Sequence, residues 1–177
     1  EERLLALLVL VQGVGKCDDA HRKAAYDFYL DNTQYVNNWD LVDSSAPAIV
    51  GGYLRDKPRK PLARLAKSQS LWERRIAVVA TQHFIRLGEF DDTLAISRLL
   101  LSDMEDLIHK ATGWMLREVG DRDETALAAF LIDHVAVMPR TMLRYAIEHF
   151  PPETRRGYLE VDRPPKSRRR VREWPSM

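Results

Sequence analysis

The chain has 177 residues, a formal net charge of +1, 45% hydrophobic and 30% charged residues, and a single cysteine, Cys17. This composition is typical of a globular protein with a hydrophobic core, and it excludes an internal disulfide framework and a bilayer-spanning segment. The length suits one domain, and the lone cysteine favours a reducing compartment. A net charge so close to zero does not by itself indicate a partner.

Helical periodicity runs through the chain in order. Apolar residues recur at spacings of three and four, and no alternating strand pattern interrupts them. The spacing predicts helices over 3–12, 18–33, 38–54, 59–68, 70–87, 91–101, 103–119, 122–136 and 139–150. Pro47 should kink or divide the third helix, because proline lacks the amide hydrogen and clashes with the preceding turn. Capping-box patterns at Ser70–Glu73 and Ser102–Glu105 should open two of the later helices.

An internal repeat is the main sign of organisation. Three apolar positions share the same place on three successive helices: Trp72, Ile76 and Ala80, then Leu107, Ala111 and Met115, then Met142, Ala146 and Phe150. A two-helix unit with a period of about 35 residues is typical of a helical solenoid, in which each unit buries its apolar stripe against its neighbours. The sequence therefore predicts an all-α solenoid, with an irregular helical bundle as the alternative.

The two ends of the chain differ from this pattern. The first residue, Glu1, already lies in a helical pattern, so we expect that N-terminal repeats are missing. The helical-repeat domain is predicted over 1–160. Residues 161–177 carry many basic side chains, several prolines and no apolar pattern, which predicts a disordered tail. Such a tail suits contact with phosphates or acidic surfaces, or simple solvation.

Cations and an indole lie beside the apolar stripes of two predicted helices. On a helical wheel, Trp114 lies at the edge of its stripe together with Lys110 and Arg117, and Arg75 and Arg86 lie at the edge of the preceding one. A row of cations along one side of a curved solenoid suits a polyanion such as DNA. The alternative is an ordinary core rim, with arginine side chains extended over it.

Trp39 and Asp43 form an unusual pair on the helix predicted over 38–54. They are four residues apart and so share one face. A carboxylate among apolar neighbours is costly to desolvate unless it is paired or used, and phosphates would repel it in a DNA site. One use is to stabilise the positive charge that appears on deoxyribose when a glycosidic bond breaks. The indole face of Trp39 also attracts cations.

Three segments resemble the DNA alkylation repair glycosylases typified by AlkD. These segments are NNWDLVD at 37–43, WERRIAVVA at 72–80 and KATGWMLREVG at 110–120, and the resemblance extends over 1–160. It implies a solenoid of HEAT-like repeats, an α-α superhelix, that hydrolyses the N-glycosidic bond of cationic N3- and N7-alkylated purines in duplex DNA. It also implies that the enzyme approaches the nucleotide from the backbone side and leaves the base in the stack. Most glycosylases instead flip the base into a pocket.

The same resemblance assigns roles to four residues. Asp43 matches the catalytic carboxylate of the family, and Trp39 and Trp114 match the tryptophans that contact the sugar and backbone of the lesion. Arg75 matches the arginine that clamps a phosphate near the lesion. Related branches that bind branched DNA lack parts of this set, whereas all four positions are filled here. Asn38 is a departure, because some members have a second tryptophan there.

Neither metal nor cofactor is expected. The histidines have no ligand spacing, and His83 lies within the apolar arc of its helix, so we interpret it as a core residue rather than a base. The expected partner is double-stranded DNA with alkylated bases, without membrane contact. A monomer in the cytoplasm, associated with the bacterial nucleoid, is expected.

Two other functions remain open from the sequence. One is a non-catalytic nucleic-acid-binding solenoid, which would keep the basic flank without needing Asp43. The other is a protein-interaction scaffold, since helical repeats also bind peptides along their concave face. The discriminating observation is whether Trp39, Asp43, Arg75 and Trp114 converge on one surface.

Overall fold

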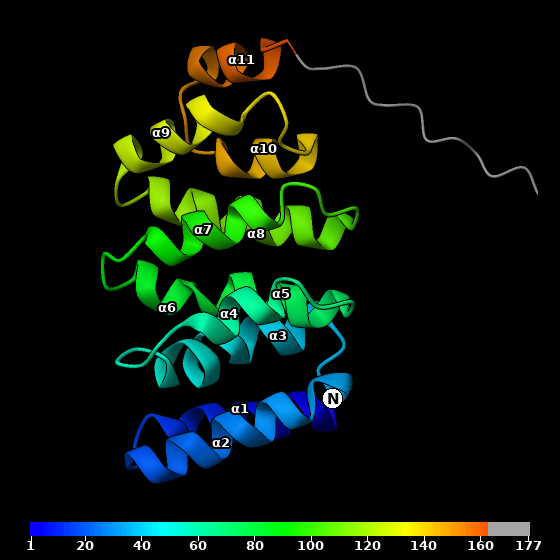
Figure 1. The fold of residues 1–177 in the computed structure, drawn as a ribbon, viewed down its shortest axis with the longest axis vertical. Coiled ribbons are helices and arrows are strands. Elements are labelled where there is room, and N and C mark those ends of the chain that lie inside the picture. The colour runs from blue at the N-terminus through cyan, green and yellow to red at the C-terminus, as the bar shows by residue number, and fades with distance from the viewer. Residues whose placement is uncertain (163–177) are drawn as a thin grey trace, which may run out of the picture.

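A computed structural model describes residues 1–162 as a stack of helices (Figure 1). The α-helices are α1 (Glu2–Val14), α2 (Asp19–Asp31), α3 (Trp39–Ala46), α4 (Lys60–Leu65), α5 (Leu71–Ala80), α6 (Gln82–Ile85), α7 (Asp91–Leu99), α8 (Asp106–Gly120), α9 (Glu124–His134), α10 (Arg140–Ala146) and α11 (Pro152–Glu160). A 3-10 helix, η1 (Thr33–Tyr35), and a π-helix, η2 (Pro47–Gly51), lie between them. The described residues contain no strand. From Arg163 onward, the predicted basic tail lies outside them.

One row of stacked helices forms the frame of the molecule. Helices α1, α3, α5, α8 and α10 pack on one another in that order. Helices α4, α7 and α9 each pack against a member of this row and alternate with it along the chain, from α1 and α2 at the bottom of Figure 1 to α11 at the top. The arrangement confirms the predicted all-α helical-repeat fold. No helix in residues 1–162 is both long and apolar enough to cross a bilayer.

The predicted repeat positions supply much of the core. Ile76 and Ala80 on α5, Ala111 and Met115 on α8, and Met142 on α10 are all at most 1% exposed. Successive residues of α8 point to opposite halves of the stack. Met115 packs into the cluster formed with the helices before α8, and Leu116 packs into the one formed with α9 and α10. Helix α8 therefore joins the two halves.

Helix boundaries follow local hydrogen bonding. The predicted break at Pro47 is confirmed, because α3 ends at Ala46 and the π-helix η2 begins at the proline. The helix predicted over 70–87 divides at Thr81, whose hydroxyl donates to the carbonyl of Val78 (2.6 Å). A threonine bonded to the preceding turn in this way bends a helix.

The two predicted capping boxes have different outcomes. Ser70 caps α5 by accepting the amide of Glu73, as predicted, but the Glu73 carboxylate accepts a hydrogen bond from the Thr33 hydroxyl (2.8 Å) instead of closing the box. The prediction of a capping box at Ser102–Glu105 is wrong. Helix α8 begins only at Asp106, and the amide of Glu105 donates to the carboxylate of Asp103.

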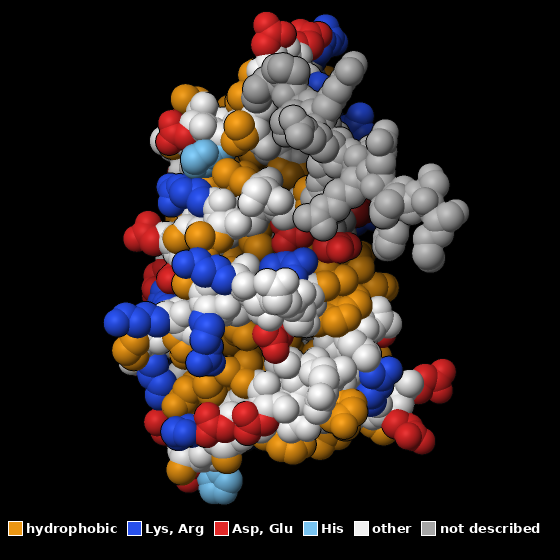
Figure 2. Space-filling view, turned by 45° about the vertical axis from the view of Figure 1, so that its right-hand side comes forward, with side chains coloured by type: hydrophobic (Ala, Val, Ile, Leu, Met, Phe, Trp, Pro, Cys, Tyr) orange, Lys and Arg blue, Asp and Glu red, His pale blue; other side chains and the backbone are white. Residues whose placement is uncertain are grey.

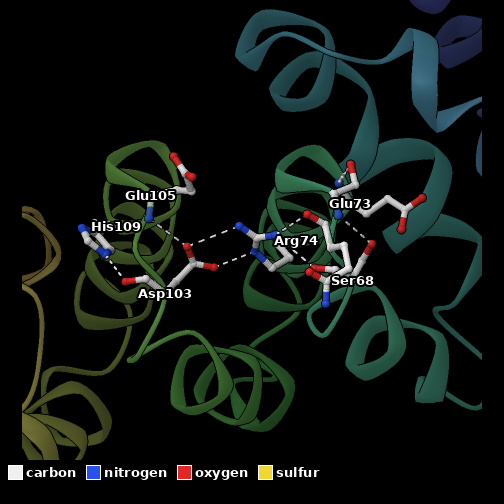
Figure 3. A network of polar contacts seen from close by, with 8 residues as sticks. Ser68, Glu73, Arg74, Asp103, Glu105 and His109 are labelled. Carbon is white, nitrogen blue, oxygen red and sulfur yellow. Dashed lines mark hydrogen bonds and ion pairs between the residues drawn. The ribbon is translucent and has the colours of Figure 1, made fainter. Parts of the chain in front are cut away.

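Asp103 takes part in a network of polar contacts that links α5 to α8 (Figure 3). Its carboxylate accepts hydrogen bonds from Arg74 Nε (2.6 Å) and Nη2 (3.4 Å), and its carbonyl contacts His109 Nε2 (2.7 Å). Arg74 Nη1 also donates to the carbonyl of Ser68 (3.0 Å). The Asp103 side chain is only 6% exposed, so solvent screens this ion pair weakly.

Removing one partner of the pair should weaken the stack. Asp103→Ala is expected to lower the free energy of unfolding by about 3 kcal/mol, because it leaves a largely buried guanidinium without a counter-charge. Urea denaturation followed by circular dichroism measures the loss. Asp27→Ala, which breaks the exposed Lys23–Asp27 pair, serves as the control and should leave the midpoint nearly unchanged. Equal losses in the two variants would contradict the assignment.

Candidate active site

The start of α3 positions Trp39 and Asp43. Asn38 caps the helix in an extended conformation, and its side chain accepts the Trp39 amide (2.8 Å). The Asp40 carboxylate accepts the Leu41 amide (2.8 Å), so the first acid serves the helix start, as the sequence indicates. Trp39 is 54% exposed, whereas the Asp43 side chain is only 17% exposed. The second acid is therefore the one held at a partly buried position.

Asp43 is bound by Arg75 of α5 through two parallel hydrogen bonds. Arg75 Nε donates to Oδ1 at 2.9 Å, and Nη2 donates to Oδ2 at 2.7 Å. The third nitrogen, Nη1, donates to the carbonyl of Leu107 at 2.5 Å. Arg75 is 5% exposed, and its guanidinium thus ties α3, α5 and the start of α8 together. Two-point contact fixes the carboxylate plane as well as its position.

A cleft of about 380 Å³ lies on one side of this pair, and we call it the indole cleft. Its walls come from α3, α5, α8 and α10: Trp39, Arg75, Leu107, Lys110, Ala111, Trp114, Arg117 and Tyr145. Both predicted tryptophans and the predicted arginine therefore line one surface. The Trp114 Nε1 donates to Glu118 (3.2 Å), which holds that indole in place.

The cations of the indole cleft already have partners. Lys110 forms an ion pair with Asp106 (2.8 Å), and Arg117 forms one with Glu148. The hydrogen bond from Lys110 to Asp106 raises the pKa of the lysine. Together with the Asp43 contact of Arg75, these pairs leave no cation of this cleft without a carboxylate.

A second cleft of about 420 Å³ lies on the other side of the Asp43–Arg75 pair, and we call it the arginine cleft. Asp43 lines this cleft rather than the indole cleft, together with Arg22, Ser44, Arg55, Gln82, His83 and Arg86. The sequence placed Arg86 and Arg75 along one flank of the solenoid. In the structure Arg86 lines the arginine cleft with Asp43, whereas Arg75 lines the indole cleft. On the face shown in Figure 2, several Lys and Arg side chains gather on the left, over the middle and lower part of the stack.

Several contributors to these clefts were missed from the sequence. Tyr145 lies in the third repeat, Arg22 on α2 and Arg55 in the turn after η2. Their positions on a helical wheel do not distinguish them from solvated surface residues. Only the packing of α2 on η2 and of α10 on α8 brings them to the clefts.

Gly113 determines how α10 reaches the indole cleft. A Cβ atom at this position would lie 2.5 Å from the carbonyl oxygen of Met142 and 2.5 Å from Tyr145 Cβ. The glycine therefore permits the close approach of α8 and α10, and that approach brings Tyr145 to the cleft wall.

No group of three or more His, Cys, Asp or Glu side chains in residues 1–162 could hold a metal ion. The candidate site is built from the carboxylate, guanidinium and indole groups already described. What it offers chemically is a fixed anion in the wall of the arginine cleft, bound to an arginine that lines the indole cleft.

Fold and site together define an α-helical repeat protein with an aromatic and cationic surface suited to nucleic acid. A family model described as DNA alkylation repair enzyme matches residues 1–150, and the chain belongs to this family. No curated protein sequence matches the chain. Membership indicates an enzyme with a role in the repair of alkylated DNA, which makes DNA its substrate, and confirms the resemblance found in the three sequence segments.

Filling the space at Gly113 should disturb the cleft. Gly113→Ala is expected to lower the free energy of unfolding by about 1–3 kcal/mol, because the added methyl group overpacks the α8–α10 contact. Gly157→Ala on α11, where a Cβ atom would meet nothing within 4 Å, is the matched control and should stabilise by up to about 1 kcal/mol through helix propensity. Urea denaturation measures whether each substitution lowers or raises the free energy of unfolding. A Gly113→Ala variant that is more stable than the wild type would contradict the packing argument.

Proposed function

We propose that the chain is a DNA glycosylase that excises cationic N3- and N7-alkylpurines from duplex DNA by hydrolysis, without flipping the base. The observation that carries this proposal is the Asp43 carboxylate, which lines the arginine cleft and is held in place by Arg75 of the indole cleft. Each of its oxygens accepts one hydrogen bond from Arg75, so each retains lone-pair capacity toward a substrate. A preorganised anion of this kind stabilises a developing positive charge without reorganising during the reaction.

The chemistry needs little beyond that charge. An alkylated purine that already carries a positive charge leaves with the electron pair of the C1′–N bond and becomes neutral. Positive charge then develops on the deoxyribose, where Asp43 stabilises it. Water adds to C1′ and its proton passes to solvent, which completes the hydrolysis. Asp43 also accepts a hydrogen bond from that water and so orients it.

The indoles support approach from the backbone side. Trp39 is more than half exposed, so its ring forms a wall at the surface rather than the lining of an enclosed base pocket. Trp114 lines the same cleft. A backbone that runs over these indoles and across Arg75 into the arginine cleft would bring a sugar to Asp43 while its base stays in the helical stack. Most glycosylases instead extrude the base and need a closed pocket to receive it.

A second candidate, a non-catalytic DNA-binding solenoid, is favoured by one observation. All three nitrogens of Arg75 already donate hydrogen bonds within the protein, two of them to Asp43. A pair of this kind also occurs as a purely structural contact between helices. The two functions differ in what the loss of the Asp43 charge does to excision.

Removing the charge of Asp43 distinguishes the glycosylase from the non-catalytic DNA-binding protein. Asp43→Asn should reduce the release of N7-methylguanine from a duplex by at least about 100-fold, because the developing sugar cation loses its counter-charge. Duplex binding by the variant should be retained. Release of free base, measured by chromatography under single-turnover conditions, checks the first statement, and fluorescence anisotropy checks the second.

Asp40→Asn is the matched control, because it removes a carboxylate about one turn earlier whose described hydrogen bond goes to the Leu41 amide at the helix start. It should excise as the wild type does. Undiminished excision by Asp43→Asn would refute the catalytic assignment. If the wild-type chain binds the duplex but releases no base, the non-catalytic candidate is favoured.

A further inference from the structure

The arginine cleft contains cations that no carboxylate neutralises. Arg22 Nε donates to the carbonyl of Val14 (3.2 Å), and Arg86 Nη2 donates to the side-chain oxygen of Gln82 (2.9 Å). Both acceptors are neutral, and within residues 1–162 neither arginine forms an ion pair. These bonds position the guanidinium groups and leave their charge uncompensated.

Arg55 adds a third charge to the same wall. Its nearest carboxylate is that of Asp56, at 3.9 Å, and both side chains are largely exposed, so water screens that contact strongly. The one carboxylate that lines the cleft, Asp43, is already paired with Arg75. The cleft therefore presents three exposed guanidinium groups to solvent with no acid of its own to offset them.

His83 lies in the wall of this cleft, within reach of the charge of the same arginines. Burial lowers the pKa of this imidazole, and the positive charges of Arg55, Arg86 and Arg59 lower it further, against an opposing effect from Glu89. Its Nε2 atom is buried without a hydrogen-bond partner in the described part of the chain. The predicted core histidine is thus a half-buried wall residue of the cleft.

The cations of the indole cleft, in contrast, are each neutralised by a carboxylate. Arg75, Lys110 and Arg117 each contact a carboxylate there, at Asp43, Asp106 and Glu148 respectively. An anionic ligand in that cleft would have to displace an acid before it gained a cation. In the arginine cleft it would meet guanidinium groups whose charge is free.

We propose that the arginine cleft is the phosphate-binding part of the site: Arg22, Arg55 and Arg86 hold the phosphodiester backbone next to the lesion sugar, while Arg75 positions Asp43. The guanidinium fork matches two phosphate oxygens at once. Because Asp43 lines this cleft, a strand that places a sugar at its carboxylate brings the flanking phosphates to the arginines. The inference rests on the proposed function in taking DNA as the ligand.

Salt dependence of duplex binding tests the assignment. With an unmodified fluorescein-labelled duplex, Arg22→Gln and Arg86→Gln should each weaken binding about three- to tenfold at about 0.1 M salt, and should lower the slope of log K against log salt by about 0.9 for each phosphate that is no longer neutralised. Arg98→Gln on α7 is the matched control. Arg98 is exposed, its described hydrogen bond goes to His134 rather than to a carboxylate, and it lies outside both clefts. It should bind as the wild type does.

The outcomes separate this inference from the glycosylase proposal. If Arg22→Gln and Arg86→Gln keep the wild-type affinity and slope, or if Arg98→Gln weakens binding as much, the phosphate assignment is overturned even when the wild-type chain excises base. If the slopes fall as expected but no base is released, the phosphate site stands and the glycosylase proposal fails. Absence of any duplex binding by the wild type overturns the inference.

A second readout needs no substitution. The pKa of His83, followed by NMR titration of the full chain, should rise when the duplex is added, because a phosphate in the cleft stabilises the imidazolium and offsets the neighbouring arginines. An Arg22→Gln/Arg86→Gln double variant should lose this rise. A pKa of His83 that is the same with saturating duplex as without it would also overturn the assignment.

Discussion

The structure of the candidate site depends on one ion pair, between Arg75 and Asp43. Removing two charges from water is costly, and mutual attraction offsets that cost only when the geometry is good and the remaining donors are satisfied. Both conditions hold, since the contact is two-pointed and the third nitrogen of Arg75 reaches the carbonyl of Leu107. The pair thereby fixes α3, α5 and α8 relative to one another, and with them the boundary between the two clefts.

That boundary bears on an electrostatic conflict in the proposed function. A carboxylate that stabilises a sugar cation is repelled by the phosphates on either side of the sugar. In this molecule Asp43 is screened by its own guanidinium, while other arginines supply uncompensated positive charge in the cleft that it faces. The aromatic and cationic halves of the site are built mostly from different helices, and only α3 contributes residues to both clefts.

Local patterns in the sequence predicted the fold well where short-range forces decide. The repeat register placed buried residues on α5, α8 and α10, and Pro47 ended α3, because periodicity and proline geometry act within a turn or two. Prediction failed where a distant partner intervened. Ser102–Glu105 has the residues of a capping box, but Asp103, which lies between them, is bound to Arg74 and accepts the Glu105 amide, so α8 starts later.

The sequence by itself determined the helices, their repeat, and the spacing that puts Trp39 and Asp43 on one face, since all of these follow from backbone geometry within a single helix. Only the tertiary structure decided that Arg75 binds Asp43, that Tyr145 joins the indole cleft, and that Arg22 and Arg86 share a cleft. These residues are far apart along the chain, and they meet because small residues such as Gly113 allow neighbouring helices to stack closely. Packing between repeats, rather than any local pattern, selects the partners.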